Sequence, residues 1–165
     1  MIGPGTGIAP MRAILQDRKH QYEEMTQASK NENGGDGGGD CDMHNVLYFG
    51  CKKEELDYIY RDELEGYKNE GILKDLHVAF SRKDPSQKEY VQHLLRKNSE
   101  STYTLLNDEG AYIFVCGGVK MGHDVTETLK EILVEESSGS MSQHGATNYL
   151  SKLSSEGRFV QELWS

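Results

Sequence analysis

The residues with the clearest chemical potential form the stretch GPGTG at residues 3–7. Its three alternate glycines leave backbone N–H groups uncovered, so an anion could approach them closely. Pro10 suits the first turn of a helix, and the apolar residues Met11 and Ile14 follow it. A glycine loop before a helix N-terminus combines free N–H donors with the positive end of the helix dipole, which favours phosphate. A plain tight turn is the alternative, because Ile8 stands where the fingerprint G-x-G-x-x-G has its last glycine.

A second group of hydrogen-bond donors follows the apolar run at residues 76–80. Its members are Ser81, Arg82, Lys88, Tyr90 and Gln92. Hydroxyl, guanidinium, ammonium, phenol and amide donors suit a phosphate monoester. No acidic residue stands at the strand end to take a free ribose 2′-hydroxyl, which favours NADP over NAD. A solvated loop is the alternative, because Asp84 and Glu89 dilute the charge of this window.

The remaining candidates are weaker. Cys116 and Gly117 end an apolar run, where glycine permits close approach of a flat ligand and a buried cysteine usually behaves as a small hydrophobe. Trp164, the single tryptophan, is either an end plug or a stacking surface for a flat ring. No metal site is expected. The carboxylates in the glycine-rich segment 31–42 lack the spacing of a calcium loop, and the pair Cys41-x-x-His44 lacks a second zinc-binding pair.

Composition narrows the possible partners. The chain has 165 residues, 36% hydrophobic and 27% charged, with a net charge of −9. This acidic balance argues against nucleic acid and against an anionic membrane surface, and no apolar run is long enough to span a bilayer. The three scattered cysteines indicate reduced thiols in an intracellular compartment. Segment 31–42 has too few apolar residues to order itself, so a mobile surface loop is expected there.

Hydrophobic patterning predicts the elements that must position these residues. Strands are expected at 46–50, 76–80, 111–116 and 158–164, and helices at 10–28, 54–67, 88–96, 124–136 and 146–153. This alternation predicts an α/β fold, a doubly wound and mainly parallel sheet with helices on both faces. Ligands of such sheets lie beyond the carboxyl ends of the strands. The segments expected at that edge are 3–7, 50–53, 81–92 and 116–121.

Several short motifs, in this order, resemble the C-terminal NADP-binding domain of the diflavin reductases, the family that includes the cytochrome P450 reductases. They are GPGTGIAP at 3–10, YFGC at 48–51, DYIYRDEL at 57–64, AFSR at 79–82, KEYVQ at 88–92, YIFVCGG at 112–118 and ELWS at 162–165. The resemblance covers nearly the whole chain except residues 29–44. Only two residues precede the glycine loop, so the chain is expected to be one NADP-binding domain, residues 1–165, from a longer flavoprotein.

The resemblance implies a role for each matching position. Gly5 and Thr6 would contact the NADP pyrophosphate. The 2′-phosphate would be held by five residues, Ser81, Arg82, Lys88, Tyr90 and Gln92. Cys116 would lie near the nicotinamide, and Asp124 would contact the adenosine side of the cofactor. Gly117 and Met121 are also expected to bind the cofactor. Glu162 would stabilise positive charge developing on the nicotinamide ring, and Trp164 would cover the flavin ring. The catalytic positions are therefore expected to be Cys116, Glu162 and Trp164.

The resemblance also implies cofactors and partners. NADPH would give a hydride to FAD in another domain of the same polypeptide, and electrons would pass through FMN to a haem protein or other acceptor. The parent would lie in the cytoplasm or on the cytoplasmic face of the endoplasmic reticulum, with no membrane contact by this chain. Gly118 departs from the family, which usually has aspartate there. A non-catalytic α/β nucleotide-binding or docking module is therefore kept as the alternative.

Overall fold

The computed structural model describes residues 1–32, 44–84 and 86–165. A short 3₁₀ turn, η1 (Gly5–Gly7), leads into the long helix α1 (Ile8–Glu32). The strands are β1 (Val46–Cys51), β2 (Asp75–Phe80), β3 (Ile113–Gly118) and β4 (Phe159–Trp164). The other helices are α2 (Glu54–Asp57), α3 (Arg61–Asn69), α4 (Val91–Lys97), α5 (Ser99–Asn107), α6 (Val119–Glu136) and α7 (Gln143–Ser155).

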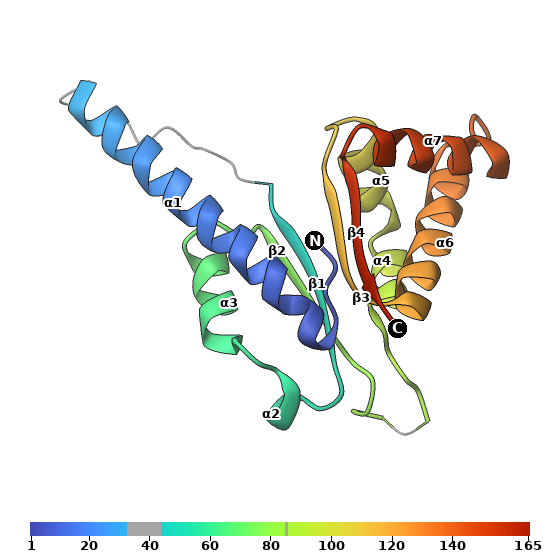
Figure 1. Cartoon of the computed structure of the whole chain (residues 1–165), viewed down its shortest axis with the longest axis horizontal. Helices are drawn as coiled ribbons and strands as arrows, with labels where there is room; N and C mark the ends of the chain where they lie inside the picture. The colour runs from blue at the N-terminus through green and yellow to red at the C-terminus, as the bar shows by residue number, and fades with distance from the viewer. Residues whose placement is uncertain (33–43, 85) are drawn as a thin grey trace.

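The strands form two parallel pairs that the start of the chain joins. β1 pairs with β2, and β3 pairs with β4. Ile2 makes parallel bridges to Tyr48 in β1 and to Val115 in β3, so it occupies the centre of the arrangement (Figure 1). The Ile2 N–H donates to the Phe114 carbonyl at 2.8 Å, and the Cys116 N–H donates to the Ile2 carbonyl at 2.9 Å. The parallel sheet is confirmed, although its central position is held by bridges rather than by a full strand.

Helices cover both faces of this sheet, as the sequence predicts. Because side chains alternate along a strand, Leu47 and Phe49 of β1 face one cluster while Tyr48 faces the other. The first cluster gathers apolar residues of α1 and α3, and the second gathers those of α4, α5, α6 and α7 (Figure 1). β1 is almost entirely buried, which explains why it is a continuous apolar run.

The single helix expected at 54–67 is wrong. The chain forms α2 and α3 instead, and Tyr60 between them adopts a left-handed backbone conformation with φ of 59°. Of the apolar residues in this segment, Leu64 and Tyr67 are buried, whereas Leu56 is 75% exposed. The Asp57 carboxylate accepts a hydrogen bond from the Lys53 N–H at 2.9 Å. This bond joins the last residue of α2 to the residue that precedes the helix. Helical spacing alone therefore overstated the core contribution of this segment.

Other boundaries also differ from the prediction. α4 begins at Val91 rather than at Lys88, and α6 begins at Val119 rather than at Asp124. α5 was not expected at all, because its sequence SESTYTLLN has little apolar periodicity. The glycine-rich segment 31–42 lies outside the described residues except for Asn31 and Glu32, which close α1. Within the described ranges, no helix combines the length and apolar character that crossing a bilayer requires.

Candidate functional site

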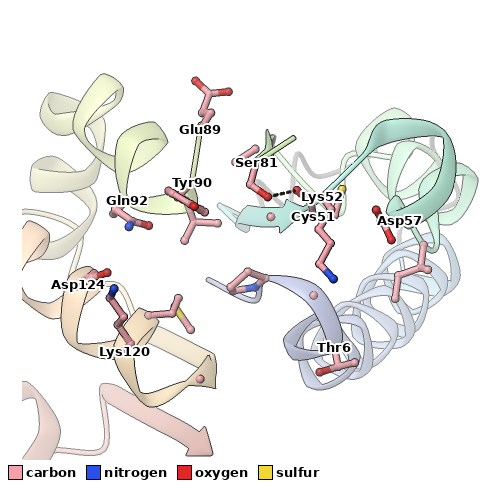
Figure 2. Close-up of a pocket in the computed structure, with 18 of the residues that line it drawn as sticks. Thr6, Cys51, Lys52, Asp57, Ser81, Glu89, Tyr90, Gln92, Lys120 and Asp124 are labelled. Atoms are coloured by element: carbon pink, nitrogen blue, oxygen red, sulfur yellow. Dashed lines mark hydrogen bonds between the residues drawn. The ribbon is translucent and has the colours of Figure 1, made fainter. Parts of the chain in front are cut away.

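A cavity of about 760 Å³ opens at the carboxyl ends of β1, β2 and β3. Its walls come from η1 and the residues before it, from the ends of β1 and β2, and from the starts of α4 and α6 (Figure 2). β1 and β2 lie on one side of Ile2 in the sheet, and β3 and β4 lie on the other side. The cavity therefore lies where the strand order reverses, the position at which open α/β sheets bind ligands. The edge predicted from topology is confirmed as the site of the cavity.

Backbone constraints shape the glycine loop at the floor of this cavity. Gly5 has φ of +58°, a left-handed conformation that glycine adopts without strain. A Cβ atom at Gly7 would lie 2.0 Å from the Cys116 carbonyl oxygen, so only glycine fits there. Gly5 and Thr6 both line the cavity and are exposed. The first N–H groups of a helix lack intrahelical partners, so the start of α1 offers donors and a positive dipole end to an anion.

The five residues that the sequence predicts to bind a phosphate fall into two sets. Ser81, Tyr90 and Gln92 line the cavity, whereas Arg82 and Lys88 are exposed and lie outside its wall. The Ser81 hydroxyl donates to the Cys51 carbonyl at 3.4 Å, which ties the end of β2 to that of β1 (Figure 2). Tyr90 precedes α4, and its ring centroid lies 5.7 Å from that of His93. The structure thus brings three of these five donors together at one wall.

The end of β3 carries the residues expected near a nicotinamide. Cys116 and Gly117 are buried and do not line the cavity, whereas Met121 and Asp124 of α6 do. Burial raises the pKa of the Cys116 thiol, and the charge of Glu162 adds to the effect. The two residues are partners in the β3–β4 register, as are Gly118 and Trp164. Glu162 and Trp164 are exposed on β4 and lie outside the cavity wall.

The binding residues expected from the sequence did not include four charged residues of the cavity, namely Lys52, Asp57, Glu89 and Lys120. The Lys52 side chain extends from the end of β1 toward Thr6 (Figure 2). Lys120 belongs to the first turn of α6, where it lies beside Asp124 (Figure 2). A single lysine directly after a strand belongs to no recognisable motif. The only sequence signal for Lys52 is therefore its place in segment 50–53, which was expected at the ligand-binding edge.

One buried polar atom in the cavity lacks a partner among the described residues. The side-chain oxygen Oε1 of Gln92 is shielded from solvent and accepts no hydrogen bond. A buried acceptor without a donor is unfavourable, so this oxygen is a local cost to stability. The start of α1 beside Gly5 and Thr6 is the part of the cavity that suits an anionic ligand.

The metal alternatives gain no support from the described residues. The aspartates of segment 31–42 and Cys41 lie outside those residues. His44 is described, and its Nδ1 lies 2.7 Å from a carboxylate oxygen of Glu109. No group of three or more potential metal ligands occurs within residues 1–32, 44–84 and 86–165.

Comparison with known proteins gives a family match and close relatives. The model of the oxidoreductase NAD-binding domain matches residues 1–127. The chain is 40% identical over 166 residues to the NADPH–cytochrome P450 reductase of Bos taurus. It is 41% identical over 165 residues to the protein of that name in Dictyostelium discoideum. These alignments cover 100% and 99% of this chain but only 22% of each relative.

Proposed function

Because this chain belongs to the oxidoreductase NAD-binding domain family, we propose that it binds NADP(H) across the ends of β1, β2 and β3 and presents the nicotinamide to a flavin held outside the chain. The single observation that carries this proposal is the cavity at the strand-order reversal, lined by the glycine loop, Ser81 and Tyr90. Sequence similarity to proteins named NADPH–cytochrome P450 reductase supports NADPH as the reductant.

The residues of the cavity fit a dinucleotide. Its volume of about 760 Å³ lies within the range of sites for molecules of this size. Gly5 and Thr6 offer backbone donors at the start of α1, where a pyrophosphate is stabilised. Gln92 also lines the cavity, where its side-chain amide could contact the ligand.

The 2′-phosphate would lie at the wall formed by Ser81 and Tyr90. Arg82 and Lys88 belong to the same loop and are exposed, so their long side chains can reach a phosphate at the rim of the cavity. The 2′-phosphate would then bind two hydroxyls and two cations. Asp124, on the opposite wall, would contact the adenosine side of the ligand.

The nicotinamide would lie at the end of β3. When bound, NADPH supplies a hydride to the flavin, and the residues of this chain orient the ring. The raised pKa of Cys116 keeps its thiol neutral, so it acts by packing rather than as a nucleophile. Glu162, its partner in register, would stabilise developing positive charge. Trp164 is 45% exposed beside Gly118 and would cover the flavin ring.

Further electron transfer belongs to the same proposal. FAD, FMN and a haem protein or other acceptor would be contributed outside this chain, which spans 22% of the bovine relative. Membership of an oxidoreductase family does not favour the alternative of a non-catalytic docking module.

Calorimetric titration of the chain with NADP⁺ and with NAD⁺ tests the proposal. The 2′-phosphate contacts should make NADP⁺ bind at least roughly tenfold more tightly than NAD⁺. Equal affinity for the two dinucleotides would contradict the assignment of Ser81, Arg82 and Lys88. The absence of any binding or thermal protection by either dinucleotide would support the docking module instead.

A further inference from the structure

One wall of the cavity is a short segment that buries little surface of its own. This segment, the α2 wall (residues 54–60), contributes Leu56, Asp57 and Ile59 to the cavity lining. Leu56 is 75% exposed and Ile59 is 42% exposed. The ring of Tyr58 lies 5.6 Å from that of Phe49, which anchors the middle of the wall to β1. A four-residue helix with so little burial opens easily unless its far end is also held.

Arg12 of α1 contacts the far end of this wall. Tyr60 ends the wall with φ of 59°, a conformation that is costly for a residue other than glycine and persists where its surroundings hold it. The Arg12 guanidinium lies over the Tyr60 ring, 4.7 Å from its centroid, and its Nε donates to the Glu63 carboxylate at 2.6 Å. The Tyr67 hydroxyl donates to the same carboxylate at 2.8 Å. Arg12 therefore binds the end of the wall and a fixed partner in α3 at once.

We propose that Arg12 is a positioning residue that latches the α2 wall to α1 and so sets the width of the cavity. For its effect on the dinucleotide, this inference rests on the proposed function. Arg12 does not line the cavity itself. It lies on the helix that directly follows the glycine loop, so one rigid element carries both the loop and the latch. The wall and the loop are thereby kept at one spacing.

The Cys51 thiol reports on the position of this wall. Cys51 is 8% exposed, and its thiol donates to the Lys53 carbonyl at 3.9 Å, directly before α2. Burial raises the pKa of the thiol to about 11, and the charges of Asp57 and Glu54 in the wall add to the effect. The wall therefore covers this thiol. If the wall opens, the thiol becomes accessible to an alkylating reagent.

Alkylation by iodoacetamide, followed at each cysteine by peptide mass spectrometry, tests the latch in the full chain carrying Cys41→Ser. Cys116, buried at the end of β3, is the internal reference, because global unfolding would expose it together with Cys51. The variants are Arg12→Met, Arg12→Lys and Lys19→Met. Lys19 is the matched control, because its ammonium also joins α1 to the end of α3, through Glu70 at 2.7 Å, but does not contact the wall.

We expect Arg12→Met to raise the alkylation rate of Cys51 roughly fivefold relative to that of Cys116. Calorimetric titration should show that the same variant binds NADP⁺ and NAD⁺ alike roughly threefold more weakly. Arg12→Lys keeps a cation that can lie over the Tyr60 ring, so it should restore most of both properties, and Lys19→Met should match the wild type.

Three results with Arg12→Met would overturn the latch and leave the proposed function intact. They are an unchanged alkylation rate at Cys51, an equal rise at Cys51 and Cys116, and an unchanged affinity for both dinucleotides. A wild-type chain that binds neither dinucleotide would overturn the proposed function instead. The ratio of the two alkylation rates would then decide by itself whether Arg12 holds the wall.

Discussion

Gly7 packs so closely against Cys116 that a Cβ atom at Gly7 would lie 2.0 Å from the Cys116 carbonyl oxygen. The last residue of η1, directly before α1, therefore packs against the end of β3 with no side chain between them. This contact fixes the glycine loop, where the pyrophosphate is proposed to bind, relative to the strand end proposed for the nicotinamide. The spacing between the two halves of the site is consequently set by backbone packing.

The variant Gly7→Ala tests this packing. A methyl group there must displace backbone, so we expect the free energy of unfolding to fall by about 1–3 kcal/mol and NADP⁺ affinity to fall with it. Urea unfolding measures the first effect. The control is Gly66→Ala in α3, where a Cβ meets no atom within 4 Å and should stabilise the helix by roughly 0.5–1 kcal/mol. Wild-type stability in Gly7→Ala would show that the contact does not constrain the fold.

The variant Arg82→Ala tests how the cofactor is selected. Loss of a charge-assisted contact to the 2′-phosphate should cost roughly 1.5–3 kcal/mol of NADP⁺ binding and leave NAD⁺ binding unchanged. Calorimetric titration of both dinucleotides gives the comparison, and Lys83→Ala, also exposed and outside the cavity wall, is the neighbouring control. An equal loss for both dinucleotides would place Arg82 away from the 2′-phosphate.

His77 should make stability depend on pH below neutrality. Its ring stacks on Tyr48 with centroids 4.7 Å apart, and burial lowers its pKa below the ordinary value of 6.5. The unfolded chain then binds the proton more readily than the folded chain, so the free energy of unfolding falls as pH drops through about 6.5. Urea unfolding of His77→Phe between pH 7.5 and roughly pH 5 should show a flatter dependence. A slope identical to that of the wild type would contradict this account. The control is His144→Phe, because His144 is an exposed residue of α7.

Glu63 should make stability depend on pH in the acid range, because its pKa is also lowered, here mainly by hydrogen bonds rather than by burial. Arg12 donates to its carboxylate at 2.6 Å and Tyr67 at 2.8 Å, and these bonds lower the pKa of Glu63 below 4.5. The resulting stabilisation is present above pH 4.5 and is lost as pH falls through the folded-state pKa.

Thermal unfolding of Glu63→Gln should therefore differ from the wild type at pH 7 and converge with it near pH 3. Glu65→Gln on the same helix is the control, because its pair with Arg61 is exposed on both sides. A difference that persists unchanged at low pH would mean that packing, not charge, sets the contribution of Glu63.

The sequence predicts those parts of the fold in which consecutive residues share one clear pattern, such as an apolar run. The apolar runs at β1 and β3 are mostly buried and the run at β2 is half-buried. The polar segments after these strands meet at one edge because parallel strands end together. Ser81, Tyr90 and Gln92 could be placed at that edge for this reason. The family motifs then assigned them a shared ligand.

The parts that the sequence does not predict depend on tertiary contacts. Leu56 and Ile59 have helical spacing, but their side chains line the cavity and do not contribute to the core. The helix is interrupted at Tyr60, which has a left-handed backbone conformation. Lys52 belongs to no motif, so only the structure shows that it lines the cavity. Arg82 and Lys88 were grouped with Ser81 from sequence, although the structure leaves both outside the cavity wall.

A crystal structure of this chain with NADP⁺ bound is the most direct test of the account. The account predicts the pyrophosphate at Gly5 and Thr6, the 2′-phosphate at Ser81 and Tyr90, and the nicotinamide at the end of β3 near Cys116. Dinucleotide bound at another surface, or in this cavity with its 2′-phosphate away from Ser81, would contradict it.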